Sequence, residues 1–214
     1  VVDFNGNCLA MIARSAVFTQ GPVNVYASDK AMLDSKVATF AASGGGSIAG
    51  SVVVNTLSNT VKASVLGSNL NATRGIEVKS LGNDKITIMT GGVGLGQGGV
   101  GGVVSFNTIQ AATESAIANS GARFSLINQD ARFKTGGIYA PDANQKVLVR
   151  AENTSTVDNT GLAGGAGVYI GGGAAVDVTK VQNRTVAYVG AGSKIYSKGD
   201  INIEAQAIKT IDSK

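Results

Sequence analysis

The chain has 214 residues and a formal net charge of +4, and its Lys and Arg residues are scattered singly, which does not predict a nucleic-acid footprint. It contains no His, the commonest general base and metal ligand, and one cysteine, Cys8, which excludes an internal disulfide and a Cys-rich zinc site. With 30 Gly, six Phe, five Tyr and no Trp it lacks the large aromatics that usually fill an enzyme core. We therefore expect no enzyme, no catalytic residues, no cofactor and no metal. No apolar window is long enough to span a membrane, so we do not expect this segment to cross one.

An alternating apolar strand that ends in Asn or Thr recurs four times along the chain, at 1–5, 51–55, 103–107 and 175–179. Its closing polar residues are Asn5, Asn55, Asn107 and Thr179. We expect these side chains to stack on their counterparts in neighbouring coils and to form a ladder.

A second strand-like motif places a polar residue between aliphatic ones, at 23–27, 76–80, 147–151 and 201–205. The spacing from this motif to the next copy of the first is held at 30 or 31 residues, whereas the other half of the unit varies in length. Such self-similarity is typical of a repeat architecture. It predicts one solenoid over 1–214, divided into units at about 1–50, 51–102, 103–174 and 175–214.

Each unit contains at least three strand-like stretches separated by Asn and Gly clusters, and no window has a helical apolar period. The best helical candidate, 109–120, aligns with the β-branched segment 57–68, so we predict strand for both. Propeller blades usually carry aromatic signatures, which are sparse here. The sequence therefore favours an all-β fold, a right-handed parallel β-helix.

Glycine-rich segments at 43–51, 90–102 and 160–174 lie in the constant half of the unit. We interpret them as strands with one bare face, which the next coil or a lateral partner can approach closely. The spacing of Gly94, Gly96 and Gly99 matches a dinucleotide-binding pattern, but a strand is expected next, where that site needs a helix. The segments contain no Asp, so a calcium-binding roll is not predicted.

An insertion at about 123–145 lengthens the third unit and is the candidate partner-binding loop, because loops that project from a solenoid commonly carry binding function. Its candidate contact residues are Arg123, Phe124, Arg132, Phe133, Lys134 and Tyr139. The same segment could instead fold over the flank of the solenoid or pack on a second chain. It also holds Asp130 and Asp142, where the carboxylates of a carbohydrate-active site could cluster.

Three segments, GSVVVNTLSNTVKASV (50–65), GGVGGVVSFNTI (98–109) and GDINIEAQAIKTID (199–212), resemble the repeats of very large type V-secreted proteins of Gram-negative bacteria. Their low-complexity repeat pattern is similar to that of leukotoxin-like filamentous adhesins and, more distantly, to that of filamentous haemagglutinin. This resemblance implies a right-handed β-helix shaft, export across both membranes to the cell surface or the medium, and roles in adhesion, cell contact and virulence. It gives no catalytic residues.

We therefore expect a structural and adhesive shaft segment, cut from a longer chain, whose partners are a host or neighbouring-cell receptor or glycan. Self-association along the shaft is a further expectation. Two alternatives stay open. One is a carbohydrate-active β-helix, such as a lyase, a hydrolase or a tailspike-like protein. The other is a laterally assembling fibril or sheath protein.

Overall fold

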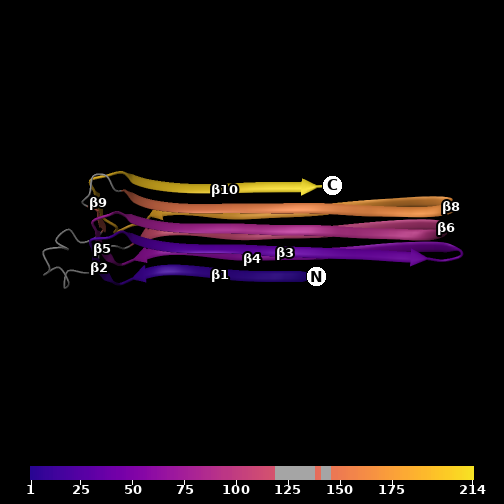
Figure 1. The fold of residues 1–214 in the computed structure, drawn as a ribbon, viewed down its shortest axis with the longest axis horizontal. Coiled ribbons are helices and arrows are strands. Elements are labelled where there is room, and N and C mark those ends of the chain that lie inside the picture. The colour runs from indigo at the N-terminus through magenta and orange to yellow at the C-terminus, as the bar shows by residue number, and fades with distance from the viewer. Residues whose placement is uncertain (119–137, 141–145) are drawn as a thin grey trace.

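The computed structural model describes residues 1–118, 138–140 and 146–214, and this part of the chain is nearly all strand, with no helix. The predicted all-β class is thus confirmed. Two long layers of parallel strands run the length of the molecule, and a set of short strands closes one end (Figure 1). The N- and C-termini lie on opposite edges of the stack (Figure 1).

The strands differ greatly in length. They are β1 (Val2–Ala13), β2 (Ala16–Thr19), β3 (Val23–Ala42), β4 (Gly46–Leu66), β5 (Asn69–Ala72), β6 (Ile76–Ala118), β7 (Ile138–Ala140), β8 (Val147–Val189), β9 (Ile195–Ser197) and β10 (Ile201–Ser213). The two longest, β6 and β8, each run out to a glycine-rich tip and return, because their first halves pair with β3 and β10 and the second half of β6 pairs with β4.

Three parallel sheets result. The outgoing sheet contains β3, residues 76–96 of β6, residues 147–167 of β8, and β10. The return sheet contains β1, β4, residues 98–117 of β6 and residues 170–189 of β8. The end sheet contains β2, β5, β7 and β9. In the outgoing sheet, residues of the second sequence motif lie in register, as Val23 pairs with Ile76, Ile76 with Val147 and Val147 with Ile201.

The first sequence motif is in register in three copies and displaced in the fourth. Asn55 pairs with Asn107, and Asn107 with Thr179, but the residue of β1 opposite Asn55 is Val2. The prediction that Asn5 belongs to the ladder is therefore wrong, because Asn5 pairs with Ser58. The later part of β1 fixes this register, since Cys8, Ala10 and Ile12 pack against the apolar core, and a shift by three residues would turn them outward.

The interior is arranged in zones along the strands. Beside the end sheet lies an apolar cluster that includes Val61, Ile76 and Val147, and further out lies a second one that includes Leu57, Ile86 and Ile109. A layer of hydrogen-bonded polar side chains separates the two clusters, and another follows the second cluster. Beyond it lies the glycine tip, where the inward positions of β6 are Gly92, Gly94, Gly99 and Gly101, and where β4 places the small side chains of Ser47 and Ala49. Every zone continues from coil to coil because the strands pair in register.

The glycine tip has almost no side chains between its two sheets. A Cβ atom built on Gly94 would lie 2.5 Å from the carbonyl oxygen of Val100, and one on Gly92 would lie 2.8 Å from that of Gly102. Real Cβ atoms do not approach backbone this closely. The close approach expected of the glycine segments is therefore confirmed, although the approaching backbone belongs to the opposite sheet. The segment after Gly99 is strand, as predicted.

The structure of two further segments bears on predictions made from the sequence. Residues 109–118 are strand in β6, as predicted for the helical candidate, and they pair with 57–66. Within the predicted insertion, Ile138–Ala140 form β7 and pair with β5 and β9, so these three residues supply the end-sheet strand of their coil.

Replacement of an inward tip glycine should destabilise the protein strongly. We expect Gly94→Ala to lower the free energy of unfolding by about 1–3 kcal/mol, because the new methyl group can be accommodated only if the sheets separate. Gly91→Ala is the matched control, since its added Cβ meets no atom closer than the carbonyl oxygen of Leu162, at 3.9 Å. Chemical denaturation of both variants measures the difference, and an equal effect of the two would contradict the close packing of the tip.

Candidate functional site

The candidate partner-binding residues fall almost entirely outside the described residues. This applies to Arg123, Phe124, Arg132, Phe133 and Lys134, and also to Asp130 and Asp142. Tyr139 lies in β7, where its backbone pairs with Asn71 of β5 and Tyr196 of β9. A binding role for this segment therefore stays a prediction, and the described chain offers its own candidates in the interior and on the outer faces.

A buried carboxylate forms the centre of the first polar layer. Asp84 has no solvent-exposed surface, and its two oxygens accept hydrogen bonds from Asn59 Nδ2 at 2.8 Å and Asn153 Nδ2 at 3.0 Å. Asn59 belongs to the return sheet and Asn153 to the next coil of the outgoing sheet. Gly82 leaves room for this network, because an added Cβ would lie 2.6 Å from Asn153 Nδ2. One carboxylate thus joins both sheets and three successive coils, those of β4, β6 and β8.

Burial raises the pKa of Asp84 above its ordinary value, because the charged form loses its hydration. The hydrogen bonds from Asn59 and Asn153 oppose this effect, and the negative charge of Asp29 adds to it. Since the net shift of the pKa is upward, the folded protein binds this proton more tightly than the unfolded chain does.

The second polar layer contains the predicted ladder in altered form. Asn55 Nδ2 donates to Asn107 Oδ1 at 3.0 Å, and Asn107 Nδ2 donates at 2.9 Å to Asp177 Oδ1. The third rung is thus Asp177, whose other oxygen accepts a hydrogen bond from Thr179 at 3.0 Å. The sequence did not lead us to expect either aspartate in these layers, where Asp84 is fully buried and Asp177 is half-buried. Counting alternate residues from Ile76 would have placed Asp84 on the inward face.

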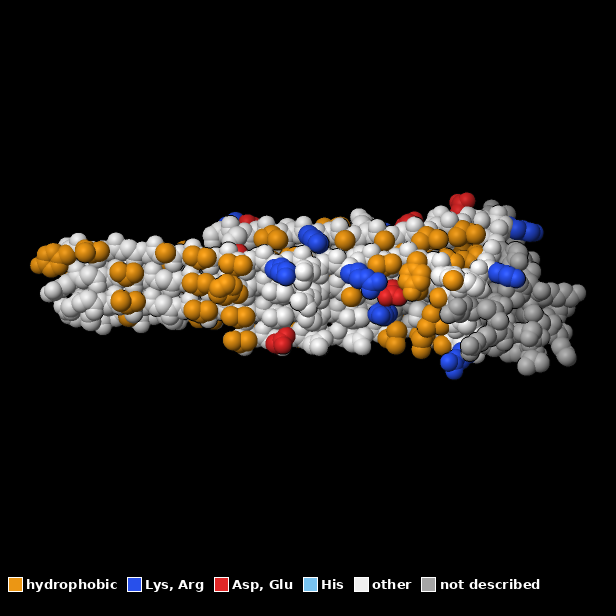
Figure 2. Space-filling model, turned by 180° about the vertical axis from the view of Figure 1, so that it is seen from behind, with side chains coloured by type: hydrophobic (Ala, Val, Ile, Leu, Met, Phe, Trp, Pro, Cys, Tyr) orange, Lys and Arg blue, Asp and Glu red, His pale blue; other side chains and the backbone are white. Residues whose placement is uncertain are grey.

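Apolar side chains cross the outer face of the return sheet beside the glycine tip. We call this set the valine stripe, and it consists of two rows across three coils, Val52, Val104 and Val176, and Val54, Phe106 and Val178. Val52 is 67% exposed and Phe106 is 43% exposed. Columns of hydrophobic side chains are visible across neighbouring strands in Figure 2. A contiguous apolar patch of this kind commonly marks an interaction surface.

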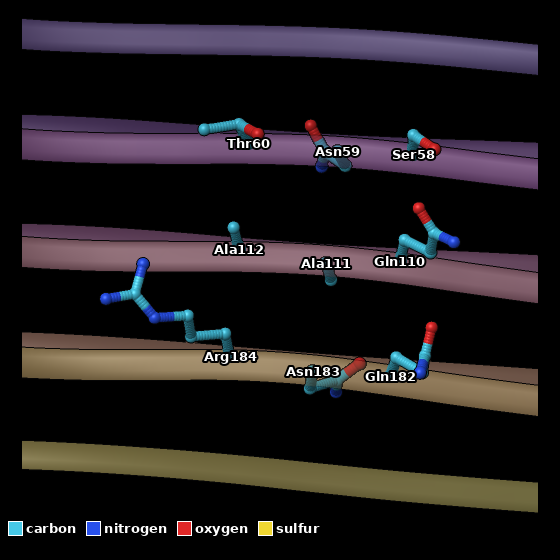
Figure 3. Close-up of a pocket in the computed structure, with 9 residues that line it drawn as sticks. All are labelled: Ser58, Asn59, Thr60, Gln110, Ala111, Ala112, Gln182, Asn183 and Arg184. Atoms are coloured by element: carbon cyan, nitrogen blue, oxygen red, sulfur yellow. The ribbon is translucent and has the colours of Figure 1, made fainter.

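A shallow polar groove lies further along the same face (Figure 3). Ala112 forms its floor, because its short side chain stands between Thr60 and Arg184 in adjacent coils. The Arg184 side chain reaches toward the strand that carries Ala112, and Gln110 lies in the neighbouring row (Figure 3). Hydroxyl, amide and guanidinium groups in this arrangement can donate hydrogen bonds to a sugar, a carboxylate or a peptide carbonyl.

Next to the groove, charged side chains are paired across coils. Lys62 Nζ lies 3.5 Å from Glu114 Oε2 and forms an ion pair with it. The hydroxyl of Tyr188 donates a hydrogen bond of 3.0 Å to Glu114 Oε1. This hydrogen bond to Glu114 is the main cause that raises the pKa of Tyr188. On the outer face of the outgoing sheet, Lys85 and Asp158 form an ion pair of 2.6 Å.

No similarity to a known protein identifies these features. Comparison with protein-family models, curated protein sequences and solved structures found no match. Within residues 1–118, 138–140 and 146–214, no group of three or more His, Cys, Asp or Glu residues could hold a metal ion. Over the same ranges, no helix is long and apolar enough to cross a membrane.

The raised pKa of Asp84 makes a prediction about pH. The stability that its protonation contributes is fully present below the pKa of the unfolded chain and is lost as the pH rises through the folded-state pKa. Lowering the pH from about 7 to about 4 should therefore increase the unfolding free energy of the native protein relative to that of Asp84→Asn.

Urea denaturation at both pH values provides the measurement. Asn83→Ala is the control, because it changes an exposed, uncharged neighbour on the same strand, and its difference from the native protein should not vary with pH. A native protein that loses stability relative to Asp84→Asn on acidification would contradict the prediction.

Proposed function

We propose that this chain is a structural and adhesive segment in the shaft of a large secreted or cell-surface bacterial filament. In this proposal the shaft is a right-handed parallel β-helix of four units of about 50 residues, displayed outside the cell. The observation that carries the proposal is the parallel, in-register pairing of successive coils, which extends along all four strands of the outgoing sheet. Such pairing satisfies the backbone and can be repeated indefinitely.

The shape of each coil supports display of a surface as the purpose of the shaft. Parallel strands lie about 4.8 Å apart, so each coil adds only that length to the stack. Solenoid repeats of about 20 residues achieve the same rise. The extra residues here extend the strands sideways and produce two broad, flat outer faces (Figure 1). These long strands therefore provide a wide contact surface and do not make the shaft longer.

The return sheet offers the better adhesive surface of the two. It combines the exposed apolar side chains of the valine stripe with the polar groove around Ala112. A receptor or glycan could bury apolar surface on the first and make hydrogen bonds in the second. Export to the cell surface, in turn, is supported by the resemblance of the repeats to type V-secreted adhesins.

An adhesion assay tests this proposal. Beads coated with the purified chain should bind cultured epithelial cells or immobilised glycans saturably, and free chain should compete. Replacing the groove residues Gln110 and Arg184 together by Ala should reduce binding several-fold, because two donors are lost. The control variant carries Lys30→Ala and Thr154→Ala, which change outward residues of the other sheet.

Two outcomes would contradict the proposal. The first is binding no greater than that of beads coated with an unrelated protein. The second is release of reducing ends from the glycans that Asp130→Ala or Asp142→Ala abolishes, which would support a carbohydrate-active enzyme instead.

A further inference from the structure

The outer face of the return sheet has a charge pattern that complements itself. One row across its four strands contains Asp3, Thr56, Thr108 and Lys180, with the acid at one edge and the base at the other. Another row contains Leu9, Lys62, Glu114 and Val186, with aliphatic residues at the edges and opposite charges in the middle. When one of two identical copies is turned over so that its strand order is reversed, each row faces the same row of the other copy, with acids opposite bases and aliphatic residues opposite aliphatic residues.

We propose that this face docks on the same face of a second copy of the chain, related by a two-fold axis parallel to the strands. The axis runs midway between β4 and the return half of β6. It places β1 of one copy over residues 170–189 of β8 in the other, and β4 over the return half of β6. The strands of the two copies then run in the same direction, as in aligned sheet packing.

This rotation brings side chains of opposite charge together. Asp3 lies opposite Lys180 of the second copy, and Lys62 lies opposite its Glu114. The existing Lys62–Glu114 ion pair thereby becomes a cluster of four alternating charges.

The apolar residues match under the same rotation. Val52 faces Val104 of the second copy, Val54 faces Phe106 and Leu9 faces Val186. Four residues of the valine stripe, Val52, Val54, Val104 and Phe106, are thereby covered by one another, whereas Val176 lies beyond the end of β1. Apolar and charged rows thus select one and the same arrangement.

Other arrangements bring like charges together. A two-fold axis perpendicular to the strands would place each strand over itself in the antiparallel direction, and an axis that crosses β8 at Gln182 would set Lys180 of one copy against Arg184 of the other. On the outgoing sheet, the rotation parallel to the strands would place Lys79 opposite Arg150. It would also set Asp34 opposite Asp212, since these residues end a row that contains Thr87 and Asp158. The opposite charges of Asp3 and Lys180, and of Lys62 and Glu114, therefore favour the return sheet and an axis parallel to the strands.

The face is large enough for a specific interface. The overlap extends over about 20 residues for β4 and the return half of β6, and over the 12 residues of β1 for the outer strands. At about 3.3 Å per residue, with neighbouring strands about 4.8 Å apart, this gives a surface on the order of 1,000 Å² per copy. A standard protein–protein interface covers about 800 Å² on each partner. The long, nearly straight strands in Figure 1 allow two such faces to lie flat against each other.

Sedimentation velocity of the full chain over a range of concentrations tests the proposal. We expect a monomer–dimer equilibrium that is weakened at least tenfold by Val52→Glu, because a charge would be buried in the apolar rows. Met32→Glu is the matched control, since Met32 is 60% exposed on the other sheet, and it should dimerise like the native chain. Circular dichroism melts establish that both variants are folded.

A charge exchange tests the axis itself. Lys62→Glu alone should weaken the dimer, because it sets acidic groups against each other across the interface. Combination with Glu114→Lys should restore dimerisation to within about threefold, since the alternating cluster is rebuilt in reverse. A native chain that stays monomeric at its highest soluble concentration would overturn the proposal. Open-ended polymers, or equal effects of Val52→Glu and Met32→Glu, would also overturn it. The second copy covers the polar groove and most of the valine stripe, so it competes with a receptor for this face. Sedimentation does not depend on adhesion, so the two proposals can fail separately.

Discussion

Backbone pairing between successive coils is the interaction on which every other feature of this molecule depends. The middle coil, β6, has a parallel neighbour along both edges over most of its length, with β3 and β4 on one side and β8 on the other. Because the pairing is in register, a side chain in one coil lies over its counterpart in the next. Interior zones therefore become continuous layers, and outer residues become rows. The glycine tip, the polar layers, the valine stripe and the self-complementary charges are all consequences of that stacking.

The polar layers give the register its specificity. An apolar interior alone would tolerate a slip of two residues, because apolar side chains would still face inward. Asp84 does not tolerate such a slip, since its oxygens would lose Asn59 and Asn153 and leave a buried carboxylate without partners. The Asn55–Asn107–Asp177 chain acts in the same way nearer the tip. The tip itself has little apolar side-chain contact, and it holds together because inward glycines let the sheets meet through their backbones.

Much of the fold was predictable, because alternation along a strand reports which face each residue occupies. The second motif aligned correctly at Val23, Ile76, Val147 and Ile201 for this reason. The first motif failed at Asn5, because a match of five letters says less about register than the inward positions of Cys8 and Ile12 do. The sequence indicated that glycines allow a close approach, but the approaching partner follows only from the folding of each coil back on itself. The exposed rows on which the docking proposal rests could not be predicted without the strand register, because they join residues more than 50 positions apart.

Amide hydrogen exchange in the middle coil tests the central claim most directly. If coil-to-coil pairing and backbone contact hold the glycine tip, amides of residues 91–101 should exchange as slowly as those of Ile86 and Ile88, which lie in the apolar zone of the same coil. Residue-resolved exchange rates should then agree to within about tenfold. Exchange of the tip amides at the rate of an unfolded chain, with the apolar zone still protected, would contradict the account.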